Sequence, residues 1–383
     1  MIAPALRVAM VAGEASGDLL GGLLLDGLKQ HWPAVEAFGI GGPQLQRRGF
    51  RAWWPSDKLA VRGYVEVLRH YREIVGIRKQ LLERLLQDPP DVFIGIDAPD
   101  FSLALETQLK ARGIKTVHFV SPSIWAWRPE RIEKIRAAVD HVLCIFPFEK
   151  PLYDQAGIAA TYVGHPLASV VPMEPDRGAA CAALGLDAQD TVVAILPGSR
   201  ASEIQYLGEV FFKAVDHINH ARPAIKFVVP CAPGLATAIR THAQTAGVLD
   251  HVQLLEGQSH TVLAACNVTL IASGTATLEA ALFKRPMVIA YNMHWLSWQM
   301  MKRNKLQPWV GLPNVLCSDF VVPEFLQDAA TPQALSQAIL GWLAQPEKIR
   351  VLEQRFTALH AELQRDTATI ACHAIAQVIH PPA

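Results

Sequence analysis

The sequence lacks the paired cysteines from which zinc sites and disulfide frameworks are built. It contains six cysteines, Cys144, Cys181, Cys231, Cys266, Cys317 and Cys372, and no two of them form a CxxC pair. Such scattered spacing suggests neither a structural zinc site nor a secreted disulfide scaffold. We therefore expect reduced thiols, a cytoplasmic location and no metal site.

Long apolar runs are also missing. No stretch approaches the roughly 18 uninterrupted apolar residues that a membrane-spanning helix needs. The apolar N-terminal run is interrupted at once by Gly13, Glu14 and Asp18, so it does not have the apolar region of a signal peptide. Any contact with a membrane is expected to come from one side.

Neither sign of charge is in excess. Lys plus Arg and Asp plus Glu both number 35. A balanced chain gives no electrostatic case for nucleic acid or an acidic polymer as its main partner. We therefore expect no nucleic-acid partner.

What is present is a chain of 383 residues, 51% of them hydrophobic, which is ample for two cores. Short continuous apolar runs alternate with segments of helical spacing along most of its length. This alternation predicts an α/β fold with doubly wound parallel sheets and right-handed crossovers. A break rich in proline and charge, from Met173 to Asp190, separates two such series. We expect two domains with a substrate cleft between their strand ends.

The predicted domains are an N-terminal one over residues 1–172 and a C-terminal one over 173–345. Residues 346–383 are expected to form helices that pack back on the N-terminal domain. The first helix is predicted from about Leu19 to Gln30, after a small-residue loop, GEASGD.

One strand stands out in the N-terminal domain. The run Val92 to Ile96 is apolar without a period, as in a strand buried on both faces, and Asp97 follows it. Ligands collect at the carboxyl edge of parallel sheets, so Asp97 stands where a reacting group would be held. The alternative is that Asp97 or Asp100 only caps the helix that follows.

Two loops in the second series are typical of anion sites. Ser273, Gly274 and Thr275 join a strand to a helix, and Glu279 lies about one turn into that helix, where it could accept hydrogen bonds from a ribose. The alternative is an ordinary Ser/Thr cap. The loop matches neither the P-loop nor the dinucleotide-binding pattern.

The other loop contains Ser199 and Arg200, after a strand that ends at Leu196. An Arg guanidinium suits a diphosphate, although Arg200 could instead pair with Glu203 on the surface. A third candidate is Asn314, in a loop flanked by Gly and Pro, where it could bind a sugar or phosphate or simply form a turn.

Eight motifs in order carry a resemblance to a known family. They are VAGEASGDLLG (11–21), VFIGIDAPDF (92–101), KTVHFVSPSIWAWR (115–128), FPFEK (146–150), VGHPL (163–167), LPGSRASEI (196–204), ASGTATLEAAL (272–282) and GLPNVL (311–316). Together they resemble lipid-A-disaccharide synthase, an inverting glycosyltransferase of the GT-B architecture, over nearly the whole chain.

The resemblance implies a specific reaction. Members transfer 2,3-diacylglucosamine from its UDP derivative to 2,3-diacylglucosamine 1-phosphate, which makes a β(1→6) disaccharide and releases UDP. By motif correspondence, Asp97 is the general base, and the donor is bound by Arg200, Asn314 and the SGTATLE loop that ends at Glu279. Glu14 and Ser16 are hypothesised to seat the acceptor, and no cofactor or metal is expected.

The resemblance also implies a cytoplasmic enzyme that lies peripherally on the inner face of the inner membrane, in contact with anionic phospholipid, and it allows a homodimer. The candidate surface is Tyr64 to Ile77, where apolar residues recur at helical spacing beside several arginines. The alternative is that this stripe faces the core. A rival function is that of a UDP-sugar 2-epimerase or a non-catalytic nucleotide-sugar binding protein.

Overall fold

The structure of the protein, a computed structural model, describes residues 5–59, 64–126, 129–295, 298–299, 302 and 306–381, with only the backbone of residues 15, 57 and 64–71. The chain forms two compact units. Unit 1 comprises Met1–Ser169 and Leu363–Ala383, and unit 2 comprises Val170–Glu362. The domain limits predicted at 172/173 and 345/346 stay a prediction, and each unit is described separately below.

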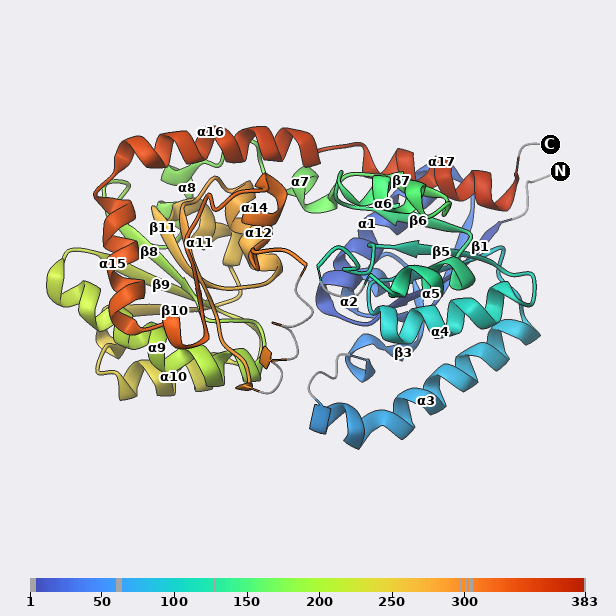
Figure 1. Ribbon diagram of the computed structural model, residues 1–383, viewed down its shortest axis with the longest axis horizontal. Coiled ribbons are helices and arrows are strands. Elements are labelled where there is room, and N and C mark those ends of the chain that lie inside the picture. Colours follow the sequence, from blue (N-terminus) through green and yellow to red (C-terminus); the bar gives the residue numbers. More distant parts are fainter. Residues whose placement is uncertain are drawn as a thin grey trace. The chain divides into compact units, whose positions relative to one another are not determined.

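Unit 1 is built on a seven-stranded parallel sheet in the order β3-β2-β1-β4-β5-β6-β7 (Figure 1). The strands are β1 (Leu6–Ala12), β2 (Val35–Gly41), β3 (Arg51–Pro55), β4 (Val92–Ile96), β5 (Lys115–Phe119), β6 (His141–Cys144) and β7 (Ala160–Tyr162). The direction of winding reverses between β1 and β4, which makes this pair the topological switch point.

The helices of unit 1 connect these strands. They are α1 (Ala15–His31), α2 (Pro43–Gln46), the short η1 (Ser56–Lys58), α3 (Tyr64–Gln87), α4 (Pro99–Lys110), α5 (Arg131–Ala138), α6 (Glu149–Gln155), α7 (Pro166–Val170) at the unit boundary, and α17 (Thr367–Ile379). Strands buried on both faces, such as β4, need this cover because their side chains are apolar throughout.

The predicted start of the first helix at Leu19 was wrong, because α1 begins at Ala15. Glu14 is its N-cap residue, and the Asp18 N–H donates to the Glu14 carbonyl at 2.8 Å. The buried Asp18 carboxylate accepts hydrogen bonds from the N–H groups of Gly42 and Gln44, both at 2.7 Å. Tertiary contacts therefore keep the small residues of this motif helical, against their weak local preference.

Unit 2 contains a six-stranded parallel sheet in the order β10-β9-β8-β11-β12-β13. The strands are β8 (Val192–Leu196), β9 (Lys226–Cys231), β10 (Val252–Glu256), β11 (Val268–Ala272), β12 (Met287–Tyr291) and β13 (Glu324–Leu326). Its switch point lies between β8 and β11. Two doubly wound parallel sheets confirm the predicted α/β class, whereas the short strands β3 and β13 were not predicted.

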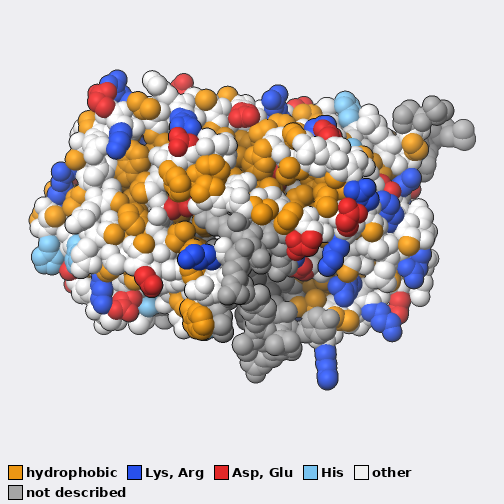
Figure 2. Space-filling view, in the orientation of Figure 1, with side chains coloured by type: hydrophobic (Ala, Val, Ile, Leu, Met, Phe, Trp, Pro, Cys, Tyr) orange, Lys and Arg blue, Asp and Glu red, His pale blue; other side chains and the backbone are white. Residues whose placement is uncertain are grey.

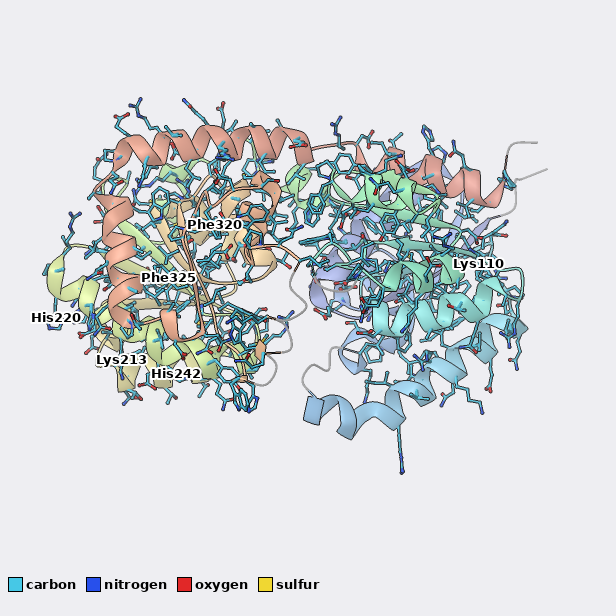
Figure 3. All side chains as sticks on the ribbon, viewed as in Figure 1. Lys110, Lys213, His220, His242, Phe320 and Phe325 are labelled. Carbon is cyan, nitrogen blue, oxygen red and sulfur yellow. The ribbon has the colours of Figure 1, made fainter. Side chains whose placement is uncertain are left out.

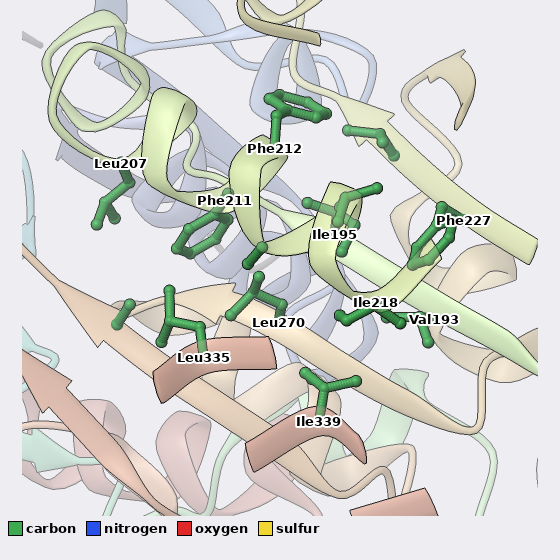
Figure 4. Close-up of a cluster of buried hydrophobic side chains, with 14 of the residues drawn as sticks. Val193, Ile195, Leu207, Phe211, Phe212, Ile218, Phe227, Leu270, Leu335 and Ile339 are labelled. Carbon is green, nitrogen blue, oxygen red and sulfur yellow. The ribbon is translucent and has the colours of Figure 1, made fainter. Parts of the chain in front are cut away.

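The helices of unit 2 are α8 (Arg177–Ala183), α9 (Ala201–Ala221), α10 (Ala236–Thr245), α11 (Ser259–Ala265), α12 (Thr275–Leu282), α14 (Leu312–Cys317), α15 (Pro332–Leu343) and α16 (Pro346–Leu363), with the short η2 (Leu249–His251) and η3 (Gln327–Ala329). The core of the unit lies where the apolar stripe of α9 meets β8 and β11. Figure 4 shows Phe211 of α9 beside Leu270 of β11 and Leu335 of α15.

The chain leaves unit 2 at the end of α16 and returns to unit 1 through α17. This last helix packs on α1, where a Cβ atom on Gly27 would lie 2.6 Å from that of Ala368. The return is held by the VGHPL motif, because the His165 N–H donates to the Leu363 carbonyl at 2.9 Å. A motif that suggested no chemistry therefore has a structural role.

Charges of both signs are interspersed over the described part of the face in Figure 2, with hydrophobic side chains scattered among them. This mixture agrees with equal numbers of basic and acidic residues, 35 of each. Within the described residues, none of the helices combines the length and the apolarity needed to cross a membrane.

Candidate active site

The switch point of unit 1 brings two of the predicted loops together. Ala12 at the end of β1 is paired with Ile96 at the end of β4, so both loops start side by side. A Cβ atom on Gly13 would lie 3.1 Å from the Cβ of Ala98. Glu14 and Asp97, both half-buried, therefore belong to the same edge of the sheet. This is the edge at which ligands of open α/β sheets bind.

Asp97 stands in a strained turn. Both Asp97 (φ 53°) and Ala98 (φ 46°) have left-handed backbone, which costs a non-glycine residue about 1–2 kcal/mol. The turn is held by the Asp97 N–H, which donates to Phe119 O at 3.0 Å, and by Ser102 Oγ, which donates to Asp97 O at 3.3 Å. Strain of this kind persists where the surrounding structure over-determines it, and such places are often functional.

The capping alternative for the two aspartates finds no support. The N-cap residue of α4 is Ala98, which has no side-chain cap bond. The Asp100 side chain is 85% exposed and pairs with Arg131 Nη2 at 2.6 Å. Asp97 is half-buried at the strand end, so it remains the better candidate for a reacting group.

A third strand end adds a carboxyl group that sequence reasoning missed. Glu149, in the FPFEK motif, is buried and accepts hydrogen bonds from the N–H of Phe146 (3.0 Å) and from the Trp125 indole (3.2 Å). Burial raises the pKa of Glu149 to about 8, although these hydrogen bonds oppose the shift. Glu149 thus ties Trp125 to the start of α6, and its place in a motif was the only signal in the sequence.

In unit 2 the switch point again brings two predicted loops together. Leu196 at the end of β8 pairs with Ile271 near the end of β11. The loops that follow contain Ser199 and Arg200 on one side and Ser273 on the other. The predicted diphosphate loops are therefore neighbours in space, at the carboxyl edge of one sheet.

The Ser273 loop presents backbone rather than side chains. Its N-cap residue is Gly274 (φ 155°), around which a Cβ atom would meet nothing within 4 Å. Ser273 Oγ lies 3.5 Å from the Val310 carbonyl and Thr277 Oγ1 donates to Gly274 O at 2.7 Å, while Thr275 is exposed. Open backbone at the start of α12 is the arrangement that an anion site needs, because the helix dipole adds to the N–H groups.

Arg200 forms an ion pair with Glu203, which was the alternative role predicted for it. Its Nη1 lies 2.6 Å from Glu203 Oε1, and Glu203 Oε2 accepts the Ser199 N–H at 2.8 Å. The Arg200 side chain is 39% exposed. Glu203 therefore holds both Ser199 and Arg200 of the PGSR loop in place.

Glu279 lies in an environment that favours its neutral form. Burial raises the pKa of the carboxyl to about 7. His260 Nε2, at the start of α11, lies 3.7 Å from Glu279 Oε2, but burial lowers the pKa of that imidazole. Glu279 can therefore change charge near neutral pH.

Asn314 is fully buried and lies on α14, not in the predicted loop. Its Nδ2 donates to Glu324 Oε1 at 2.8 Å and to Val322 O at 2.9 Å, while its Oδ1 accepts the Val322 N–H at 3.0 Å. These bonds use most of what the amide can offer. They indicate that Asn314 holds a loop, and its role in binding a donor stays a prediction.

Glu324, which accepts a hydrogen bond from Asn314, is a second residue that sequence reasoning missed. Its neighbour on β13, Phe325, packs on the core of unit 2 (Figure 3), so alternation along the strand turns Glu324 to the other face. There its Oε1 accepts the Gly311 N–H at 2.8 Å and its Oε2 accepts the Val310 N–H at 2.9 Å. Because Val310 O is the partner of Ser273, Glu324 and Asn314 support the Ser273 loop from behind.

Within the described ranges, no group of three or more His, Cys, Asp or Glu side chains is arranged to hold a metal ion. The six cysteines are all unpaired, five of them buried.

Comparison with known proteins places the chain among a group of close relatives. Residues 8–376 match a family profile described as lipid-A-disaccharide synthetase. The lipid-A-disaccharide synthase of Albidiferax ferrireducens is 69% identical over 379 residues, which cover 98% of this chain and 97% of that protein. The protein of the same name from Verminephrobacter eiseniae is 61% identical over the same shares of the two chains.

Solved structures resemble the fold at low sequence identity. A UDP-GlcNAc 2-epimerase from Neisseria meningitidis bound to UDP-GlcNAc has a TM-score of 0.66 and 12% identity, covering 98% of this chain and 99% of that one. MurG of Acinetobacter baumannii has a TM-score of 0.59 and 13% identity, covering 98% and 100%. Because both identities are so low, these likenesses bear on the fold alone.

Proposed function

The chain belongs to the lipid-A-disaccharide synthase family of glycosyltransferases, and from this premise we propose that it transfers 2,3-diacylglucosamine from UDP-2,3-diacylglucosamine to 2,3-diacylglucosamine 1-phosphate. The products are the β(1→6) disaccharide 1-phosphate and UDP. The observation that carries the proposal is the sequence match over nearly the whole chain. The rival, a UDP-sugar 2-epimerase, has only a likeness of fold in its favour.

The proposed reaction inverts the anomeric carbon. Asp97 acts as general base and takes the proton of the acceptor 6-hydroxyl as that oxygen attacks the sugar. Its half-buried position at the switch point of unit 1 supports this role. Glu14, the N-cap residue of α1, and Ser16, in the first turn of that helix, are proposed to seat the acceptor sugar or its phosphate.

The donor is proposed to bind in unit 2. The open N-terminus of α12 at Ser273, Gly274 and Thr275 receives the diphosphate, and Arg200 adds positive charge to the leaving UDP. Glu279 accepts hydrogen bonds from the ribose, while Asn314 acts through Glu324 by holding the loop behind Ser273.

The proposed substrates carry acyl chains, and the enzyme is proposed to work at the inner face of the inner membrane. Each buried methylene is worth about 0.8 kcal/mol, so taking whole acyl chains into water would cost more than a soluble cleft could offset. The N-terminal part of α3 is the candidate surface. Arg62 lies outside the described residues, and the side chains of Val65 and Leu68 are among those not described.

The decisive experiment is a transfer assay. UDP-diacylglucosamine is incubated with and without the monosaccharide lipid acceptor, and UDP and disaccharide are quantified by mass spectrometry. We expect UDP release that depends on acceptor, with one disaccharide per UDP. Conversion of the donor without acceptor would instead support the epimerase.

The same assay tests the base. Asp97→Asn should fold normally and lose about 10²- to 10⁴-fold in turnover, since general-base catalysis is worth that much. Asp100→Asn is the matched control, because Asp100 is exposed and paired with Arg131, and it should retain turnover. Near-parental turnover in folded Asp97→Asn would refute the assignment. The alanine variants of Glu14 and Ser16 should raise the acceptor KM.

A further inference from the structure

A buried pair of titratable side chains lies against the strand that ends at Asp97. His118 of β5 and Glu106 of α4 are both fully enclosed, with Nδ1 and Oε1 2.8 Å apart. Gly95 of β4 makes room for them. It pairs in register with His118, and a Cβ atom there would lie 2.2 Å from Glu106 Oε1. A side chain at position 95 would therefore collide with the Glu106 carboxylate, which explains the glycine.

The pair is connected to the Asp97 turn through α4. Ser102 and Glu106 are four residues apart, so they share one face of the helix. Ser102 Oγ donates to Asp97 O at 3.3 Å, and the Ser102 N–H donates to Ala98 O at 3.0 Å. The face of α4 that carries Glu106 therefore also carries the bonds that hold the left-handed turn.

Stability alone does not account for a charged pair at this place. Buried ion pairs lose so much hydration that well-packed apolar residues would usually serve stability as well or better. This pair is moreover incompletely satisfied. Glu106 Oε2 and His118 Nε2 have no hydrogen-bond partner among the described residues. Such a pair lowers stability but fixes how the two elements sit on each other. A polar contact allows one relative position, whereas an apolar contact tolerates several.

The charges of the pair also bear on Asp97. Burial lowers the pKa of His118, but the charge and hydrogen bond of Glu106, together with the charge of Asp97, outweigh burial and raise it. The charges of both carboxylates therefore favour the protonated form of the imidazole.

We propose that Glu106 and His118 are positioning residues for Asp97, which lock α4 on β4 and β5 and thereby hold the strained Asp97–Ala98 turn in its working geometry. This inference rests on the proposed role of Asp97 as the base. The start of α4 needs such a lock because its N-cap residue, Ala98, supplies no side-chain bond of its own. Without the pair, the two left-handed residues can relax and move the carboxylate away from the acceptor.

The test compares Glu106→Gln and His118→Gln with the parent in the transfer assay. A misplacement of about 1 Å can cost on the order of 10²-fold in rate, so we expect kcat to fall by roughly 10- to 100-fold. The KM for both substrates and the affinity for UDP should stay close to parental. This split separates positioning from a merely structural role, which would lower the melting temperature and leave kcat intact well below it.

Thr116→Val is the matched control. Thr116 is a buried polar residue on the same strand, two residues from His118, and its Oγ1 donates to Ala138 O at 2.9 Å. Its loss should lower stability while kcat stays parental. Ser102→Ala is a second probe that removes the bond to Asp97 O without stranding a buried charge, and it should lower kcat even if the pair variants fail to fold.

The outcomes separate the inference from the function it rests on. If Asp97→Asn is as active as the parent, the proposed base fails. If Asp97→Asn is inactive but Glu106→Gln, His118→Gln and Ser102→Ala keep the parental kcat, the base stands and the positioning inference is overturned.

Discussion

At the scale of residues, chemically similar carboxyl groups differ in exposure and in hydrogen-bond partners, because the fold places them in different surroundings. Asp100 is 85% exposed. Glu279 and Glu149 are buried enough to raise their pKa values to about 7 and about 8. Asp18 is buried but accepts several backbone N–H groups, so its charge is compensated. Burial without full compensation therefore moves the pKa values of Glu279 and Glu149 towards neutral pH.

Glu279 allows a direct test of this difference. If its carboxylate accepts the ribose hydroxyls, UDP should bind better as the group ionises, which happens as the pH rises through about 7. Between pH 6 and pH 8 the ionised fraction grows by roughly tenfold, so UDP affinity should grow by up to that factor. Titration calorimetry at several pH values measures it.

Glu279→Gln supplies the control for this titration, because UDP itself also gains charge in the same range. The variant should bind UDP more weakly at pH 8 and should lose the part of the pH dependence that belongs to the carboxyl. His260, 3.7 Å away, cannot compensate, since burial lowers its pKa. Parental affinity with an unchanged pH profile in the variant would rule out Glu279 as a donor ligand.

At the scale of elements, the site is made by helices that begin directly after buried strands. α4 follows β4 after the Asp97–Ala98 turn, and α12 follows β11 after Ser273 and Gly274. Neither helix has a side-chain cap at its N-cap residue. The first turns are instead positioned by contacts from other elements, Glu106 with His118 in one case and Glu324 with Val310 in the other.

The contact between the VGHPL motif and the chain near Leu363 also has a measurable effect on stability. Gly164 has φ +82°, and a Cβ atom there would lie 2.5 Å from Arg365 Cβ and 2.8 Å from Leu363 O. Gly164→Ala should therefore lower the free energy of unfolding by more than the roughly 1–2 kcal/mol of left-handed strain alone. Urea unfolding followed by circular dichroism measures the loss.

Gly113→Ala isolates the contribution of strain. Gly113 has the same φ of +82° and lies in the same unit, but its Cβ would meet nothing within 4 Å. It should therefore cost only the strain. Equal losses in the two variants would mean that the close approach of Leu363 and Arg365 to Gly164 adds nothing to stability.

At the scale of the whole molecule, the chain passes between its two units twice, near Ser169 and near Leu363. Each unit has its own parallel sheet and its own switch point. The acceptor-side candidates Glu14, Ser16 and Asp97 all belong to unit 1. The donor-side candidates, from Ser199 to Asn314, all belong to unit 2. In the proposed function, unit 1 therefore binds the acceptor and unit 2 binds the donor.

The proposed membrane association concerns the whole molecule and can be tested on α3. Val65→Ser combined with Leu68→Ser should reduce flotation with anionic liposomes and leave the melting temperature nearly unchanged. Basic residues near the helix make the binding sensitive to salt, so flotation should also fall as ionic strength rises.

Ile74→Ser is the contrasting variant. Ile74 is half-buried and packs against the core of unit 1, and Ile77, one turn further along, is buried. The apolar stripe predicted from Val65 to Val75 therefore turns into the core at its C-terminal end. Ile74→Ser should lower stability with little effect on flotation. Parental flotation of the Val65/Leu68 variant would move the membrane contact elsewhere.

The sequence by itself determined the alternation of most strands and helices, the α/β class and the family. Each of these depends on local features: apolar runs without a period, small-residue loops at strand ends, and motifs in a set order. The strand before Asp97 was predicted residue for residue, since a run buried on both faces shows in composition alone. The short strands β3 and β13 were not predicted, because a few partly buried residues do not form a recognisable apolar run.

Only the tertiary structure decided which partner each polar residue takes. Arg200 pairs with Glu203, Asn314 binds Glu324, and Glu106 meets His118 across a glycine on a third element. The Arg200–Glu203 pair is local and was an alternative already named from the sequence, whereas the other two do not show in spacing, because they depend on where helices settle on their sheets. The pKa values of Glu149 and Glu279 depend on burial for the same reason. Residue type supplies the chemical group, and packing sets its charge and direction.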